Sequence, residues 1–347
     1  METLSSTSNT EIPFSFTGKT GEYFGIWIVN VLLIIVTLGI YTAWAKVRTN
    51  RYFYGHTFLD NAPFDYLANP ISILIGWTIG IVIFIAYSIS VNFFPLVGFA
   101  FMLLVFLFLP WFVVRAMAFR LKNTAHRNIR FAFNKNYSEA ALVFIGLPFL
   151  IFLTLGLILP YMMYRQKKFI VENSNYGQTP FTFNATVWDF YKLALIAFGL
   201  FVAVIVVISI LGGALGAILA NDGAADPTMI KMFIMVPLFL LYFFIFAYWQ
   251  TKITNLIWNN VQLEQHQFRS TLKVSYMLWL YFSNTLAILL SLGLLIPWAR
   301  VRTTRYRLEN LAFIPDGDLN AFLAARQLEE NAIGEQVGEI MDIDIGL

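Results

Sequence analysis

Five times along the chain an aromatic side chain is followed four residues later by a cationic one, at the end of a long apolar run. Residues four apart lie on one face of a helix. Such a face suits the headgroup level of a bilayer, where rings anchor and cations meet phosphates. The pairs are Trp44 with Arg48, Trp111 with Arg115, Tyr161 with Arg165, Tyr248 with Lys252, and Trp298 with Arg302. We predict membrane-interface anchors that bind anionic phospholipid headgroups; the alternative hypothesis is a cationic pore mouth or anion site built from five copies.

Two asparagines, Asn30 and Asn284, lie inside apolar runs, each sixteen residues after the Phe that opens its segment. Polar residues at this depth mark an intramembrane polar site in many transporters. They also serve as hydrogen-bonding contacts between helices. Both interpretations remain open from the sequence.

Catalytic chemistry has little support in the residue pattern. The chain has no cysteine, which excludes disulfides, thiolate catalysis and iron–sulfur clusters. His56, His126 and His266 occupy different positions in the repeat, and none has a second ligand four residues on. No Ser-His-Asp or Walker pattern and no carboxylate pair within an apolar run is present. We predict no enzyme, no cofactor and no metal site; an intramembrane enzyme would need titratable groups that converge in a cavity.

Composition indicates a membrane protein, because 59% of the 347 residues are hydrophobic and only 12% are charged. Long uncharged runs approach or exceed the roughly 20 residues that a spanning helix needs. They predict an all-α polytopic protein with about seven transmembrane helices, and a net charge of +3 does not indicate nucleic-acid binding. The candidate spans are residues 24–45, 71–91, 93–114, 140–163, 190–220, 229–250 and 275–298.

An internal repeat organises residues 1–315. Each unit opens with an extended aromatic-x-aromatic step, such as Phe14-Ser-Phe16 or Phe131-Ala-Phe133, which we place at the membrane edge. Asn, or His56 in the first unit, follows each leading aromatic by twelve residues. Units with one apolar segment alternate with units that have two. The units are residues 14–63, 64–130, 131–180, 181–267 and 268–315.

The membrane side of each junction depends on whether the single units span. With seven spans, the junctions at 161–183 and 248–270 lie opposite the others, and Lys and Arg divide 15 to 8. If the single units are re-entrant hairpins, 22 of the 23 cations share one side and only Lys231 does not. We favour seven spans because re-entrant backbone must be shielded by protein. The positive-inside rule then places the C-terminus in the cytoplasm.

Residues 316–347 differ from the rest of the chain, with eight carboxylates and one cation, Arg326. Apolar residues at helical spacing make part of this segment amphipathic. We predict an acidic C-terminal tail that docks on the basic junctions or on a partner.

Several of these motifs together resemble the YjgN-like family of bacterial inner-membrane proteins. They are TLGIYTAWAKVRTNRYFYGHT, its echo SLGLLIPWARVRTTRYRLEN, the opening FSFTGKTGEYF and the end of the tail. The resemblance implies a multi-pass protein of the bacterial inner membrane, in a family without an established activity. Transport or channel-like passage of a small solute is the first functional hypothesis. The alternative is a structural or envelope-organising protein that binds anionic headgroups or a protein partner, and a homo-oligomer is also considered.

Overall fold

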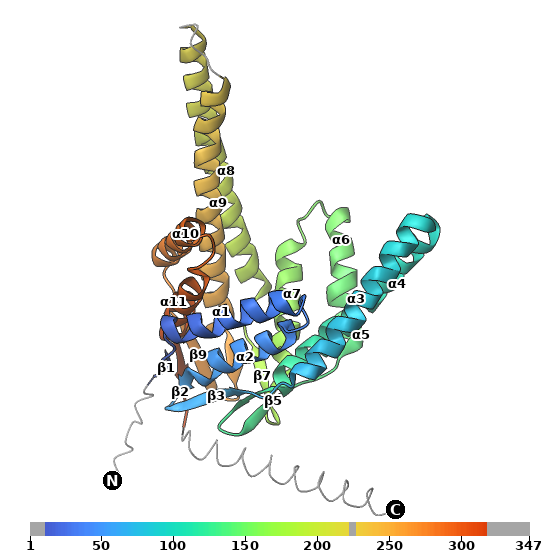
Figure 1. The fold of residues 1–347 in the computed structure, drawn as a ribbon. Helices are drawn as coiled ribbons and strands as arrows, with labels where there is room; N and C mark the ends of the chain where they lie inside the picture. The colour runs from blue at the N-terminus through green and yellow to red at the C-terminus, as the bar shows by residue number, and fades with distance from the viewer. Residues whose placement is uncertain (1–10, 222–226, 318–347) are drawn as a thin grey trace, which may run out of the picture.

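In the computed structural model, short strands form a ring, and the helices extend from one side of it (Figure 1). The structure describes residues 11–221 and 227–317. The helices are α1 (Thr20–Val36), α2 (Thr42–Gly55), α3 (Pro70–Phe93), α4 (Pro95–Lys122), α5 (Tyr137–Ala141), the π-helix η1 (Leu142–Gly146), α6 (Leu147–Leu153), α7 (Leu159–Glu172), α8 (Val187–Asn221), α9 (Pro227–Trp258), α10 (Val274–Leu290) and α11 (Ile296–Glu309). The strands are β1 (Ile12–Phe16), β2 (Thr57–Leu59), β3 (Ala62–Tyr66), β4 (Thr124–His126), β5 (Ile129–Phe133), β6 (Ser174–Tyr176), β7 (Thr179–Phe183), β8 (Val261–Leu263), β9 (His266–Ser270) and β10 (Leu311–Ile314). The fold is mostly helical but not all-α, which corrects the prediction.

The strands close into one antiparallel barrel in the order β1-β10-β9-β8-β7-β6-β5-β4-β3-β2. The extended steps that open the units are confirmed as strands β1, β3, β5, β7 and β9. The short strands before four of them have no counterpart in the prediction, because three residues are too few to show an alternating pattern. Two-residue turns join these pairs, as at Asp60 and Asn61, whose φ angles are 48° and 57°. Turns of this left-handed type match the twist of paired strands.

The recurring Asn ends a helix and begins a strand. At Asn173 the side-chain Nδ2 donates to the Phe169 carbonyl at 2.9 Å, which caps the end of α7. The Asn173 carbonyl accepts from the backbone N–H of Asn134 at 2.8 Å, just beyond β5, the strand that opens the same unit. One residue thus satisfies a helix-end carbonyl and ties the end of its unit back to the strand that opens that unit. The same pair of bonds is made at Asn123, Asn260, Asn310 and, through its ring Nδ1, His56.

Contacts between the last and first units close the ring. The Arg305 side chain donates to the Gly18 carbonyl at 2.8 Å. Arg300 donates to the Tyr23 hydroxyl at 3.0 Å, and its guanidinium lies 4.8 Å from the centre of the Phe53 ring. Residues nearly 300 positions apart therefore hold the first and last helices together.

Each single unit folds back as a helical hairpin. In the first, Thr37 Oγ1 donates to the Leu33 carbonyl at 2.6 Å and accepts from the Tyr41 N–H at 3.0 Å. Gly39, at φ 94°, donates to the Ile34 carbonyl at 2.8 Å. The turn therefore satisfies much of its own polar backbone. In the other two turns, Gly156 and Gly293 make the same backbone bond, to the Ile151 and Ile288 carbonyls. Thr154 Oγ1 donates to the Leu150 carbonyl, and Ser291 Oγ accepts from the Leu295 N–H.

In each of these three units the structure has two shorter helices joined by a turn in place of one long helix, so the prediction of seven spans is wrong for them and the hairpin alternative describes the fold. The bonds within each turn satisfy backbone groups that we expected neighbouring protein to shield. Each hairpin tip also carries a leucine that is almost fully exposed: Leu38, Leu155 and Leu292, at 94%, 93% and 94%. All five junctions contribute strands to one barrel, so they lie together at one end of the fold.

Among the described residues, three helical segments are long and apolar enough to cross a bilayer: Pro70–Phe93, Pro95–Lys122 and Val187–Ala214. All belong to the double units, which form the long hairpins α3–α4 and α8–α9. These two hairpins diverge as they leave the barrel (Figure 1). Most of the predicted acidic tail, residues 318–347, lies outside the described residues.

Candidate functional site

A ring of large side chains lies inside the barrel at one level. Alternate residues of a strand share a face, and the central Phe of every five-residue strand faces the lumen. Each of these Phe residues pairs in register with a lumen-facing residue of the neighbouring strand. The pairs are Phe14 with Leu59, Phe64 with His126, Phe131 with Tyr176, Phe181 with Leu263, and Phe268 with Phe313. Five equivalent pairs therefore encircle one space.

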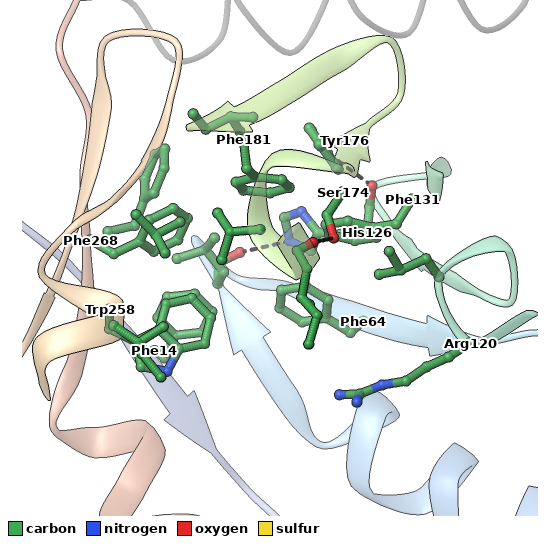
Figure 2. Close-up of a pocket in the computed structure, with 18 of the residues that line it drawn as sticks. Phe14, Phe64, Arg120, His126, Phe131, Ser174, Tyr176, Phe181, Trp258 and Phe268 are labelled. Carbon is green, nitrogen blue, oxygen red and sulfur yellow. Dashed lines mark hydrogen bonds between the residues drawn. The ribbon is translucent and has the colours of Figure 1, made fainter. Parts of the chain in front are cut away.

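All ten ring residues line a cavity of about 370 Å³ (Figure 2). That volume falls within the usual range of small-molecule sites. Neighbouring rings are in contact: Phe131 and Phe181 are stacked with their centroids 6.4 Å apart, and Phe268 and Phe313 are 5.3 Å apart. The wall is overwhelmingly apolar, so it can hold an apolar group. Towards the helices the cavity is lined by Met117, Arg120 and Leu121 of α4, Ile170 and Val171 of α7, and Ile257 and Trp258 of α9.

His126 is the imidazole in this wall. Its ring stacks on Phe64 with the centroids 4.5 Å apart, and its Nε2 lies 3.3 Å from the Leu59 carbonyl oxygen. Burial lowers the pKa of His126, and the nearby Arg127 adds to this effect. The imidazole is therefore neutral at pH 7, and with its proton on Nε2 it donates to Leu59.

The end of the cavity at the β-turns is closed by a polar contact. Arg127 forms an ion pair with the Asp60 carboxylate and also donates to the Asp60 carbonyl at 2.9 Å. The Tyr176 hydroxyl donates to the His126 carbonyl at 3.1 Å. The two charges at this end neutralise each other, so they leave the aromatic ring as the main surface available to a ligand.

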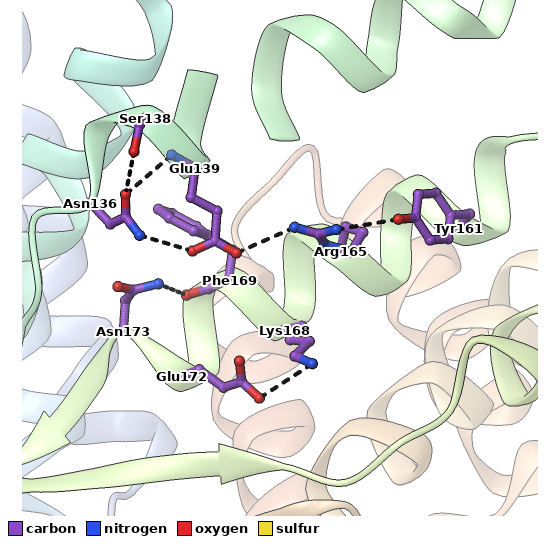
Figure 3. A network of polar contacts seen from close by, with 9 residues as sticks. All are labelled: Asn136, Ser138, Glu139, Tyr161, Arg165, Lys168, Phe169, Glu172 and Asn173. Atoms are coloured by element: carbon purple, nitrogen blue, oxygen red, sulfur yellow. Dashed lines mark hydrogen bonds and ion pairs between the residues drawn. The ribbon is translucent and has the colours of Figure 1, made fainter. Parts of the chain in front are cut away.

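Three of the five predicted interface cations, Arg115, Arg165 and Arg302, make contacts within their own units. Figure 3 shows Arg165 between the Tyr161 hydroxyl, at 3.2 Å, and the Glu139 carboxylate, at 3.4 Å. These contacts hold α7 against α5. Arg115 lies 5.4 Å from the centre of the Trp111 ring, on its own helix. None of the five predicted cations is among the described residues that line the cavity.

The two predicted intramembrane asparagines lie between the helices of their hairpins. Asn284 is buried, and its Nδ2 donates to Thr303 Oγ1 at 3.0 Å and to the Ala299 carbonyl at 3.4 Å. Arg302 donates to the Asn284 Oδ1 at 3.3 Å and lies 5.1 Å from the centre of the Trp298 ring. The arrangement fastens α11 to α10.

In the first unit, Asn30 is also buried, and its Nδ2 lies 3.5 Å from the Ala45 carbonyl. Asn30 and Asn284 thus occupy equivalent places in two separate hairpins, away from the barrel cavity. The other two histidines are also apart from the cavity wall: His56 caps α2, and His266 accepts from the Asp316 N–H at 3.0 Å.

Sequence reasoning missed the lumen ring, although the signal was present. Phe64, Phe131, Phe181 and Phe268 each follow a leading aromatic by twenty residues, with a two-residue turn between them. Because the number of residues from the leading aromatic through the helix end and the tight turn is constant, each Phe lies at the same level of the barrel. What the sequence does not show is that the strands curve into a ring, which turns five separate edges into one lumen.

The comparisons with known proteins point to a bacterial membrane family. A family model described as "Bacterial protein of unknown function (DUF898)" matches residues 11–340. The inner membrane protein YjgN of Salmonella typhimurium (strain LT2) is 32% identical over 160 residues, which are 45% of this chain and 40% of the relative. YjgN of Escherichia coli (strain K12) is 30% identical over 146 residues, which are 42% of this chain and 37% of the relative. The chain therefore spans about two fifths of the length of the curated relatives it matches. No solved structure matches the chain.

Proposed function

The chain belongs to the DUF898 family of bacterial proteins, with relatives named as inner membrane proteins, and we propose that its barrel binds the apolar part of an amphiphile taken from the bilayer. The single observation that carries this proposal is the aromatic ring around a cavity of about 370 Å³. Five units contribute to the ring, so the site exists only in the assembled barrel. An apolar cavity in a membrane protein is a natural place for an acyl or isoprenoid chain.

The position of the cavity supports access from the membrane. Its wall continues from the strands to the ends of α4, α7 and α9, and residues in the last turn of each of these helices line it. An amphiphile already in the bilayer could thus enter beside a helix end. The hypothesis of small-solute transport is narrowed accordingly, because an aromatic lumen suits an apolar group better than a polar solute.

The cation distribution supports a cytoplasmic barrel. With the single units as re-entrant hairpins, all Lys and Arg residues except Lys231 fall on the barrel side, 22 of 23. The positive-inside rule then assigns the barrel and the C-terminus to the cytoplasm. We also infer that the five units are copies of one ancestral unit, since cap, turn and lumen Phe recur at the same spacing.

Photolabelling tests the proposal directly. The protein in lipid nanodiscs is irradiated with an uncharged dodecyl diazirine, and the labelled residues are mapped by mass spectrometry. Label should appear on the lumen strands as well as on the lipid-facing helices α3 and α4. The lipid-facing label serves as an internal control for probe delivery.

A filled lumen provides the matched variant. Leu59→Phe with Leu263→Phe introduces, at the same register, the residue that the last unit already has as Phe313. The fold should therefore accept the change. Strand labelling should fall several-fold while helix labelling stays constant. Label confined to α3 and α4 in the unmodified protein would contradict the proposal and favour the alternative of a headgroup-binding structural protein.

A further inference from the structure

Two cationic side chains without a partner among the described residues belong to the helix end of the barrel: Arg120 lines the cavity, and Lys167 lies one helical turn before the lining residues Ile170 and Val171. Arg120, near the end of α4, lines the cavity, and its side chain extends on the Phe64 side in Figure 2. It makes no side-chain hydrogen bond or ion pair with any residue that the structure describes. The other cation in the wall, Arg127, is already neutralised by Asp60 at the opposite end.

A comparison of equivalent positions sets Arg120 apart. Nine residues after the leading aromatic, the units carry Phe53, Arg120, Ile170, Ile257 and Arg307. Arg307 occupies the same position in the last unit, but it donates to the Tyr281 hydroxyl at 2.6 Å. Arg120 is thus the cation of this set that is available to a ligand.

Lys167 is the second cation. It lies on α7, and residues three and four positions later share its face; these are Ile170 and Val171, which line the cavity. Lys167 is partly buried and has no ion pair within the described chain, whereas the adjacent Lys168 pairs with Glu172 at 3.8 Å. A half-buried ammonium group without a counter-ion is costly unless an anion approaches it.

The cavity volume limits the length of the apolar chain. A water-sized group occupies about 30 Å³, and a methylene group is of similar size, so the cavity can hold about a dozen such groups. A planar guanidinium suits a carboxylate or phosphate. Building on the proposed function, we propose that the ligand is an anionic amphiphile, with its chain among the ring phenylalanines and its carboxylate or phosphate between Arg120 and Lys167.

Competition against the dodecyl diazirine tests this proposal. Dodecanol, dodecanoate and dodecyl phosphate are each titrated over the same range of mole fraction in the nanodisc bilayer at pH 7.5. The anions should reduce strand labelling at roughly tenfold lower mole fraction than dodecanol, equivalent to about 1.4 kcal/mol. Whichever anion competes better identifies the head group as carboxylate or phosphate.

The variant Arg120→Gln with Lys167→Gln should remove the advantage of the anions and leave competition by dodecanol unchanged. Competition by dodecanol also reports that the barrel is folded. Lys122→Gln removes a charge two residues from Arg120, on the same helix but outside the described cavity wall, and should keep the advantage. Equal competition by all three compounds in the unmodified protein overturns the anionic site but not the apolar one. Absence of strand labelling overturns the proposed function itself.

Discussion

The strongest consequence of the barrel is that junctions which seven spans would separate must lie on one side of the membrane. The absence of cysteine makes this testable with single cysteines. Asp65 on β3 and Gln178 in the β6–β7 turn are both exposed, so Asp65→Cys and Gln178→Cys should leave the packing intact. Leu155→Cys places a thiol at the tip of the third unit's hairpin.

The structure gives the magnitudes. Strands β3 and β7 both line one cavity, through Phe64 and Phe181. Opposite sides of a bilayer would place these strands at least about 30 Å apart. The first arm of the hairpin, Tyr137–Leu153, has 17 residues and therefore a length of about 25 Å. We therefore expect Leu155 to lie deep in the hydrocarbon, where exposing it to water would cost about 2 kcal/mol.

The assay uses a membrane-impermeant maleimide on right-side-out and inside-out vesicles. Asp65→Cys and Gln178→Cys should both react in inside-out vesicles, to more than about tenfold the extent seen in right-side-out ones. Leu155→Cys should stay unlabelled in both until detergent is added. Reaction of the first two cysteines in opposite vesicle types would refute the barrel and restore the seven-span topology.

Two further predictions concern stability. Gly293 has φ 93°, a left-handed backbone that costs an L-residue about 1–2 kcal/mol. Gly293→Ala should therefore lower the apparent melting temperature in detergent, whereas Gly25→Ala, inside α1 with open space around it, should not. Equal melting temperatures for the two variants would argue against the turn. Burial lowers the pKa of His126 below its unfolded value of 6.5, so its stabilising effect is complete above pH 6.5 and is lost as the pH falls through the folded pKa. His126→Leu should therefore reduce the loss of stability between pH 7.5 and pH 5.5. Part of that loss should remain, because the pKa of buried His266 is also lowered. An unchanged dependence of stability on pH would show that His126 does not titrate with unfolding.

Much of the local structure could be predicted from particular residues. The Asn that follows four of the five leading aromatics by twelve residues marks a helix end, and the structure shows it as the cap, for example Asn173 on Phe169. The aromatic-x-aromatic steps are strands, and the long apolar runs of the double units are the long helices. Each of these features depends on side chains within a few residues of one another, so spacing along the chain is sufficient to reveal it.

The single units show where this reasoning ends. Length and hydropathy are similar for a helix that crosses a bilayer and for a hairpin arm that turns back, so residues 24–45 were compatible with both. The hydrogen bonds of the turn, such as those of Thr37 with Leu33 and Tyr41, distinguish the hairpin from a single spanning helix. Those bonds depend on backbone geometry that composition does not encode.

The sequence by itself determined the membrane class, the family and the five-unit register, because burial in lipid and helix capping act locally. Only the tertiary structure shows that the repeated Phe positions of the five units meet at one level of one barrel. Phe14 and Phe313 lie about 300 residues apart, yet both line the same lumen. Only closure of the strands by hydrogen bonds between distant units, from β1 to β10, brings the phenylalanines around one cavity.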